Sequence, residues 1–282
     1  MRLVSYGERG LELPAVLLTS GLVPITALGP EWPRTAVGLI ASGRLEEAAA
    51  RATGVATRVD PATVRLGAPV PQAGKIICIG MNYADHAAEQ GKEHPLEPLL
   101  FCKTGNTLSG PHDPIPHPRA EVFLDYEVEL VVCIGKQARD VKKADALDYV
   151  AGVMVGNDVS ARRWQRGDGQ WYRGKSCDGF FPCGPALVTL DELGPLSELH
   201  LTTTVNGVVR QDAKASLLIH DIPALIAHIS ADITLEPGDL ISTGTPCGVG
   251  AFLKPPVALK AGDEVVCAIA GVGELRNRVV AR

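Results

Sequence analysis

The sequence predicts a mainly β fold of the α+β class, in which a curled or barrel-like sheet carries a few peripheral helices. The chain of 282 residues contains 30 glycines and 21 prolines, a turn-rich composition that is typical of many short strands. From residue 75 onward, apolar runs of strand length recur and are closed by turn residues, and few segments have helical periodicity. A hydrophobic content of 46% allows a sizeable core and excludes a disordered chain.

Residues 1–70 are expected to form a small N-terminal α/β domain. Its predicted elements are three strands (Arg2–Tyr6, Ala15–Leu18 and Val23–Leu28) and one helix (Arg44–Ala52). Prolines and glycines between residues 61 and 74 indicate a linker. The alternative is that this region extends the main fold.

Residues 75–282 are expected to form the second, larger domain. Its predicted strands are Lys75–Gly80, Glu127–Ile134, Ala151–Gly156, Ala186–Thr189, Leu201–Val205, Leu240–Thr243 and Glu264–Ile269. Asn206-Gly207 predicts a hairpin turn. Asp221 is the expected N-cap of a helix that starts at Ile222, and Ala144–Tyr149 is a second short helix.

Composition also excludes several classes of protein. The net charge is −5 without a basic patch, so nucleic acid is not expected as a partner. No apolar stretch is long enough to span a membrane, and the N-terminus lacks the apolar core of a signal peptide. The seven cysteines form no CxxC pair, which favours buried thiols in a reducing cytoplasm.

An acidic motif is the sharpest candidate for chemistry. On a strand, Asp125, Glu127 and Glu129 share one face, where adjacent carboxylates repel one another unless water or a cation separates them. Asp158 follows the apolar run that ends at Val155. Carboxylates on rigid strands, without sulfur or imidazole, suit a hard ion such as Mg²⁺ or Mn²⁺. The alternative is a half-exposed strand with a solvated acidic face.

Three further segments are candidates. His86 and Glu89 lie three residues apart in a helical segment and form either a general-base pair or a surface contact. Lys175 lies in a glycine-flanked loop and is either functional or solvated. Gly244–Gly250 follows a strand and can present backbone N–H groups to an anion, although its spacing matches no phosphate-binding motif.

In this order, the motifs resemble the fumarylacetoacetate hydrolase family over about residues 75–280. The segments that carry the resemblance are Gly80-Met81-Asn82-Tyr83-Ala84-Asp85-His86, Phe101-Cys102-Lys103, Asp125-Tyr126-Glu127-Val128-Glu129-Leu130, Asn157-Asp158-Val159-Ser160-Ala161-Arg162, Gly174-Lys175-Ser176 and Gly244-Thr245-Pro246. Gly169-Gln170-Trp171 is most similar to the bacterial branch of 2-hydroxyhepta-2,4-diene-1,7-dioate isomerases, ureidoglycolate lyases and diketo-deoxy-sugar-acid hydrolases.

The resemblance implies roles for individual residues. A divalent cation, Mg²⁺ or Mn²⁺, would bind Glu127, Glu129 and Asp158, and His86 with Glu89 would activate water on a segment that closes over the site. Lys175 would neutralise developing negative charge. The substrate contacts would be Tyr83, Arg162, Gln165 and Thr245. Relatives commonly carry an acid where Arg163 stands, so the local pattern of ion pairs differs here.

The expected function is that of a cytoplasmic, homodimeric, metal-dependent enzyme that acts on a 2-oxo or 2,4-dioxo acid through a metal-stabilised enolate. The reaction would be C–C bond hydrolysis or isomerisation in the catabolism of aromatic or sugar acids. The candidates to recognise a distal carboxylate or hydroxyl are Arg162, Gln165, Arg166, Trp171 and Arg173, and the alternative is that the arginines are solvated. The alternatives are an oxaloacetate decarboxylase or acylpyruvate hydrolase, a non-catalytic metabolite-binding member of the family, and a metal-free structural protein.

Overall fold

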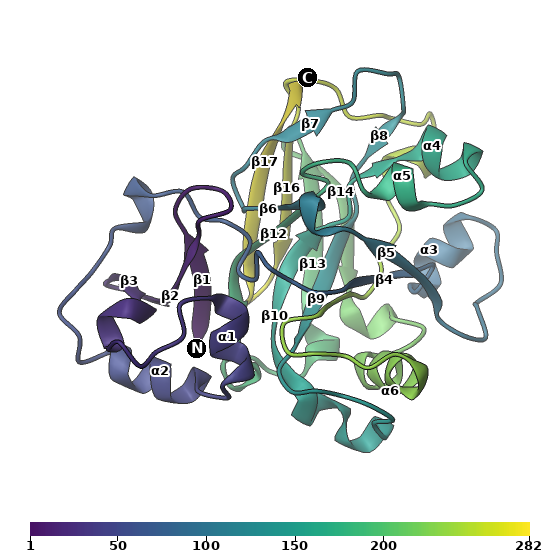
Figure 1. Cartoon of the computed structure of the whole chain (residues 1–282). Helices are drawn as coiled ribbons and strands as arrows, with labels where there is room; N and C mark the ends of the chain where they lie inside the picture. The colour runs from purple at the N-terminus through teal and green to yellow at the C-terminus, as the bar shows by residue number, and fades with distance from the viewer.

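The computed structural model describes residues 1–282 and contains two principal sheets (Figure 1). The larger is a ten-stranded mixed sheet with the strand order β3 (Gly21–Pro24), β2 (Leu13–Leu18), β1 (Arg2–Tyr6), β12 (Phe181–Val188), β10 (Val150–Asn157), β9 (Val128–Ile134), β15 (Leu240–Ser242), β4 (Ile76–Gly80) and β5 (Leu99–Lys103), with β6 (Leu108–Ser109) paired to β12. The second has five strands, in the order β14 (Val208–Lys214), β13 (His200–Val205), β16 (Glu264–Ile269), β17 (Gly273–Ala281) and β7 (Ile115–His117).

The smaller elements lie around these sheets. A two-stranded sheet joins β8 (Leu124–Asp125) to β11 (Ser160–Ala161). The α-helices are α1 (Ala36–Ala41), α2 (Leu45–Ala52), α3 (Ala84–Glu89), α4 (Arg162–Gly167), α5 (Tyr172–Lys175) and α6 (Ile222–Asp232). This is the mainly β, α+β fold with peripheral helices that the sequence predicts. None of the helices is long and apolar enough to cross a membrane.

Strand β9 is buried on both faces, which explains its unbroken apolar run. Val128, Leu130 and Val132 point into the larger hydrophobic cluster, which also contains residues of the five-stranded sheet. Val131 and Cys133 point the opposite way, into a second cluster. The alternation of side chains along the strand therefore joins both layers of the molecule.

The N-terminal segment shares its sheet and its core with the rest of the chain. Strand β1 pairs with β12, with Arg2 opposite Val188. The second hydrophobic cluster contains Leu3 and Ile25 together with Phe181. In Figure 1 this segment is drawn in purple, and its strands form the end of the larger sheet that is joined to the rest through β12. A domain boundary between residues 70 and 75 stays a prediction.

Several predicted elements differ at their ends. The strand expected over Val23–Leu28 ends at Pro24, and Ile25–Leu28 forms a 3₁₀ helix, because proline lacks the N–H that a continuing ladder needs. The segment expected as the helix Ala144–Tyr149 is a 3₁₀ helix over Lys143–Tyr149. Helix α1 was not predicted.

Two local predictions are confirmed. Asp221 caps α6, since its carboxylate accepts a hydrogen bond from the backbone N–H of Ala224. Asn206 and Gly207 have φ angles of 50° and 78°, the left-handed conformation of a two-residue hairpin turn, and they connect β13 to β14.

The strand directions bring four chain segments together at one edge of the larger sheet. Strands β4 and β15 run parallel, with Ser242 opposite Cys78, so the loops that follow them leave from the same edge. Strand β9 runs antiparallel to both β15 and β10 and begins at this edge. Strand β10 ends there, with Asn157 opposite Val128. The segments that carry the candidate functional residues therefore converge.

Candidate active site

Three buried carboxylates converge at this edge. Glu127 precedes β9, Glu129 lies within β9 and Asp158 follows β10, and the pairing of Val128 with Asn157 sets them side by side. Each offers an oxygen atom within 4.8 Å of the others. Only 5%, 2% and 0% of the surfaces of Glu127, Glu129 and Asp158, respectively, are exposed. A solvated acidic face, the alternative interpretation of this motif, is excluded.

Buried cations neutralise part of this charge. The Lys175 Nζ atom donates to Oε2 of Glu127 at 2.6 Å and to Oδ2 of Asp158 at 2.7 Å. Lys103 donates to the other oxygen of Asp158, also at 2.6 Å. Arg162 donates from Nη2 to Oε1 of Glu127. Each cation is itself buried, and together they join Glu127 and Asp158 in a network of charge-assisted hydrogen bonds. Glu129 instead accepts hydrogen bonds from the Ser242 hydroxyl and the backbone N–H of Gly244.

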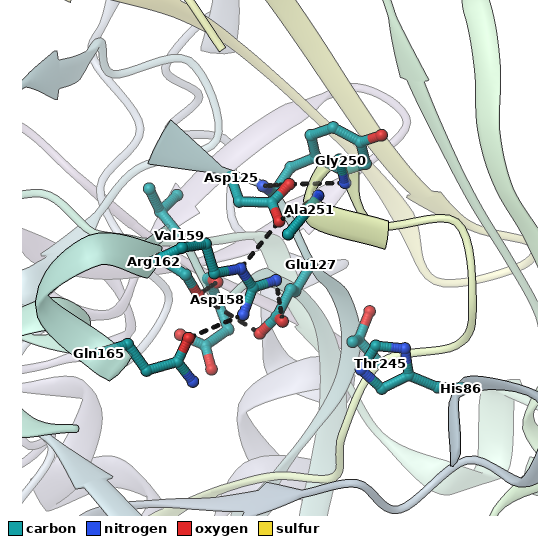
Figure 2. A network of polar contacts seen from close by, with 12 residues as sticks. His86, Asp125, Glu127, Asp158, Val159, Arg162, Gln165, Thr245, Gly250 and Ala251 are labelled. Atoms are coloured by element: carbon teal, nitrogen blue, oxygen red, sulfur yellow. Dashed lines mark hydrogen bonds and ion pairs between the residues drawn. The ribbon is translucent and has the colours of Figure 1, made fainter. Parts of the chain in front are cut away.

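Asp125 belongs to this network but does not line the cavity. The strand expected through the acidic motif is interrupted, because β8 ends at Asp125 and β9 begins at Val128. The Asp125 carboxylate accepts hydrogen bonds from Nε of Arg162 at 2.8 Å and from the backbone N–H groups of Gly250 and Ala251 at 2.8 and 3.0 Å (Figure 2). Asp125 therefore holds Arg162 against Glu127.

Burial and neighbouring charges give the glutamates opposite pKa shifts. Burial by itself would raise the pKa of Glu127, but the Arg162 and Lys175 cations outweigh it and hold this pKa well below its usual range. Burial, together with the Asp158 and Glu127 carboxylates, raises the pKa of Glu129 to about 8. Although burial opposes it, the attraction of Asp158 and Glu127 raises the pKa of Lys175 to about 12.

His86 and Glu89 are in contact on α3. Nδ1 of His86 lies 3.0 Å from Oε2 of Glu89, whose other oxygen accepts a hydrogen bond from the backbone N–H of Gly248 at 3.0 Å. This arrangement favours the tautomer in which Nδ1 carries the hydrogen and Nε2 is an acceptor. In that tautomer, Nε2 accepts a hydrogen bond from the side-chain amide of Gln90, at 2.8 Å.

One cavity of about 230 Å³ joins the acidic cluster to His86. Its lining comprises Ile79, Gly80, Met81, His86, Gln90, Lys92, Phe101, Glu127, Glu129, Arg162, Gln165, Arg166, Trp171, Lys175, Thr245 and Phe252. Figure 2 places His86 and Thr245 on one side of the buried network and Gln165 on the other. Asp158 and Glu89 do not line the cavity themselves, but they contact the lining residues Lys175 and His86.

The candidate substrate contacts differ in what they can offer. The Thr245 hydroxyl donates to the carbonyl oxygen of Val128 and accepts from Gln211, whereas its backbone N–H has no partner in the protein. Gln165 accepts from Nη1 of Arg162 at 3.0 Å. Tyr83 is fully buried, its hydroxyl has no partner, and it does not line the cavity. Of Thr245 and Tyr83, only Thr245 is therefore accessible from the cavity.

The donor chemistry of the cluster fits a divalent ion. Three carboxylates and no sulfur or imidazole ligand make a set that Mg²⁺ and Mn²⁺ prefer. The raised pKa of Glu129 indicates that the cluster has more acid than its lysines and arginine can neutralise. Glu127, Glu129 and Asp158 are the residues that would hold the ion.

Sequence reasoning assigned no role to two residues of the site. Lys103 ends β5 within the motif Phe101-Cys102-Lys103, but nothing in its spacing shows that it reaches Asp158. Gln90 directly follows α3, and its contact with His86 depends on the turn at the helix end.

The α+β fold thus places an acidic cluster and a histidine that is paired with a glutamate at one cavity. This arrangement is typical of the active site of an enzyme. Residues 75–280 match the model of the fumarylacetoacetate (FAA) hydrolase C-terminal domain, and the chain belongs to this family.

Relatives and solved structures cover nearly the whole chain. The rat protein named oxaloacetate tautomerase Fahd2a, mitochondrial, is 42% identical over 287 residues, which is 99% of this chain and 92% of its own. Fumarylacetoacetate hydrolase from psychrophilic Exiguobacterium antarcticum is 37% identical, with a TM-score of 0.88 and full coverage of both chains. Maleylpyruvate hydrolase from Sphingobium sp. SYK-6, solved with manganese(II) and pyruvate, is 33% identical, with a TM-score of 0.83 over 100% of this chain and 99% of its own.

The first prediction concerns the pH dependence of the metal-free protein. The pKa of Glu129 is 4.5 when unperturbed and about 8 in the folded protein, so folding binds a proton between these values. The contribution of Glu129 to stability is therefore full below pH 4.5 and is lost as the pH rises toward 8. Glu129→Gln mimics the protonated carboxyl and removes this loss. In thermal unfolding with EDTA, the variant should exceed the wild type at pH 8, by ~2–4 °C for each kcal/mol, and match it near pH 5. An equal difference at both pH values would contradict the assignment.

A second prediction tests the anchoring role of Asp125. Asp125→Ala leaves Arg162 and two backbone N–H groups without their acceptor inside the protein, so we expect a loss of about 3–5 kcal/mol in the free energy of unfolding. Glu198→Ala is the control, because its exposed ion pair with Lys214 should contribute about 0–1 kcal/mol. Urea unfolding measures both. Similar losses in the two variants would refute the role of Asp125.

Proposed function

We propose that the protein is a Mg²⁺- or Mn²⁺-dependent enzyme that interconverts the keto and enol forms of a 2-oxo acid. The observation that carries the proposal is the single cavity that brings Nε2 of His86, an acceptor nitrogen in contact with Gln90, to a metal-type carboxylate cluster. The rat relative named oxaloacetate tautomerase supports a substrate of this class.

The contacts indicate which role each group would have in the reaction. The ion, when bound, would stabilise the negative charge that develops on the 2-oxo oxygen as the C3 proton leaves. Nε2 of His86 would accept that proton, because Glu89 keeps the hydrogen of the imidazole on Nδ1. The same nitrogen would then deliver the proton to the 2-oxo oxygen, which completes an isomerisation without any co-substrate. The free N–H of Thr245 would hold the substrate carboxylate.

The buried cations keep this arrangement in place. Lys175 lies between Glu127 and Asp158, and Arg162 contacts Glu127 from the other side. Both side chains line the cavity, so their positive charge also faces the reacting group. The family resemblance implies this charge-neutralising role for Lys175, and its position supports the role.

C–C bond hydrolysis is the second candidate reaction. The support is the structural similarity to a maleylpyruvate hydrolase solved with manganese(II) and pyruvate. In this reaction Nε2 of His86 would take its proton from a water molecule, and the water would attack the C4 carbonyl of a 2,4-dioxo acid. The same dyad and the same carboxylates would serve, so the two reactions differ in what reaches Nε2. A homodimer is proposed from the family resemblance alone, and a cytoplasmic location from the pattern of the cysteines.

The metal requirement tests the proposal. We expect EDTA to abolish the ketonisation of enol-oxaloacetate, followed by its ultraviolet absorbance, and added Mn²⁺ or Mg²⁺ to restore it. A full catalytic rate in excess EDTA would rule out metal-assisted chemistry. Hydrolysis of acylpyruvates without any ketonisation of enol-oxaloacetate would favour C–C bond hydrolysis, the second candidate.

A separate prediction tests the dyad. In Glu89→Gln the amide group can donate to Nδ1, so the imidazole hydrogen moves to Nε2 and the base is lost. We expect kcat to fall by about 10²–10⁴-fold while the metal still raises the melting temperature. Glu93→Gln, an exposed change nearby in the same segment, is the control. Equal kcat values for the two variants would show that Glu89 has no part in proton transfer.

A further inference from the structure

A buried glutamine of the second sheet reaches the candidate site. Gln211 lies on β14, an edge strand of the five-stranded sheet, and only 1% of its surface is exposed. It pairs with Thr203, whereas the next pair is Thr204 with Val209, so Arg210 is an extra residue that forms a β-bulge. A bulge bends a strand and changes the direction of its side chains. The Gln211 amide contacts the start of β9 and the loop that follows β15.

The bulge also supports this loop directly. The carbonyl oxygen of Arg210 lies so close to Gly248 that a Cβ atom there would be 1.9 Å from it. Gly248 also has a φ angle of 97°, which favours glycine. Its backbone N–H donates to Glu89, the partner of His86. Strand β14 is therefore packed against the same loop that carries Thr245.

The Gln211 amide makes all four hydrogen bonds that a side-chain amide can make. Its Oε1 atom accepts from the backbone N–H of Val128 at 3.0 Å and from the hydroxyl of Thr203 at 2.9 Å. Its Nε2 atom donates to the hydroxyl of Thr245 at 2.8 Å and to the carbonyl oxygen of Pro246 at 2.9 Å. Because the Val128 N–H can only donate and the Pro246 carbonyl can only accept, the amide has one orientation.

These partners belong to the two halves of the site. Val128 lies between the two glutamates of the acidic cluster, and Thr245 carries the N–H that has no partner in the protein. Strand β15 pairs with β9 only over residues 131–133, so the start of β9 has no strand neighbour on that side. The side chain of Gln211 takes the place of the missing neighbour and joins the acidic strand to the loop.

We infer that Gln211 is a positioning residue, which holds the free N–H of Thr245 at a fixed distance from the metal-binding carboxylates. The inference rests on the proposed function. In a 2-oxo acid the carboxylate is bonded directly to the oxo carbon, so the N–H that binds the carboxylate and the ion near the oxo oxygen need a matching separation. A misplacement of about 1 Å can lower a rate by about 10²-fold. Gln211 does not line the cavity, so it acts through Thr245 and not by contact with the substrate.

Pyruvate is a probe of this spacing that needs no turnover. Gln211→Met keeps the length of the side chain but removes all four hydrogen bonds. In calorimetric titrations of the Mn²⁺-loaded protein, we expect Kd for pyruvate to rise at least about tenfold. Kd for Mn²⁺, measured from the electron paramagnetic resonance of the free ion, should change by no more than about twofold. The reason is that Arg162, Lys175 and Ser242 still hold the two glutamates.

Asn277→Leu is the matched control. Asn277 is also a buried side-chain amide of the five-stranded sheet, with 1% of its surface exposed, and it donates to the carbonyl oxygens of Gly110 and Asp113. None of these three residues lines the cavity. The control should lower the melting temperature and leave both Kd values unchanged. If it weakened pyruvate binding as much as Gln211→Met does, the effect of Gln211 would be one of general stability, and the inference would be overturned.

Thr245→Val tests the same link from its other end, also in the event that Gln211→Met does not fold. Valine has nearly the shape of threonine and keeps the backbone N–H, but it cannot accept the hydrogen bond from Gln211. We expect Kd for pyruvate to rise roughly fivefold or more. In the double variant the two effects should be less than additive, because both changes break one link. Additive effects, or an unchanged Kd in Thr245→Val, would contradict a role that is exerted through Thr245.

The outcomes separate this inference from the proposed function. A wild type that binds neither Mn²⁺ nor pyruvate would overturn the proposed function itself. If the wild type binds both, an unchanged pyruvate affinity in Gln211→Met, or an equal loss of Mn²⁺ and pyruvate affinity, would overturn the positioning role alone. A selective loss of pyruvate affinity in Gln211→Met and in Thr245→Val supports that role.

Discussion

The structure depends on the compensation of a buried negative charge. Glu127, Glu129 and Asp158 lie within 4.8 Å of one another with almost no exposure to water. Isolated carboxylates could not remain charged in such a place, so Lys103, Lys175 and Arg162 are buried with them. The compensation is incomplete at Glu129, whose pKa is raised to about 8. A bound divalent cation would complete it.

The fold explains why these charges meet. Antiparallel pairing of β9 with β10 sets Glu129 opposite Gly156 and brings Asp158 to the same edge. Because β4 and β15 are parallel, the segments that follow them leave from that edge, the first with His86 on α3 and the second with Thr245. Glu89 connects the two segments, because it accepts a hydrogen bond from the backbone N–H of Gly248. His86 and the charged cluster therefore come from different segments but share one cavity.

Much of this could be predicted from the sequence, because short-range patterns encode it. The period of two along β9, the apolar run before Asp158 and the three-residue spacing of His86 and Glu89 are all local. Long-range contacts were missed. These contacts join residues that are far apart in the chain: the ion pair of Lys103 with Asp158, the hydrogen bond from Gly250 to Asp125, and the pairing of β1 with β12. Tyr83 shows the same limit, since its motif gave no sign that the side chain is buried outside the cavity.

The most direct test of the central claim is an anomalous difference map from crystals of the protein grown with Mn²⁺. The account predicts one strong peak in contact with carboxylate oxygens of Glu127, Glu129 and Asp158, at about 2.0–2.3 Å, with the ammonium group of Lys175 displaced from between the carboxylates. A map without a peak there, or with manganese bound only at surface carboxylates, would contradict it.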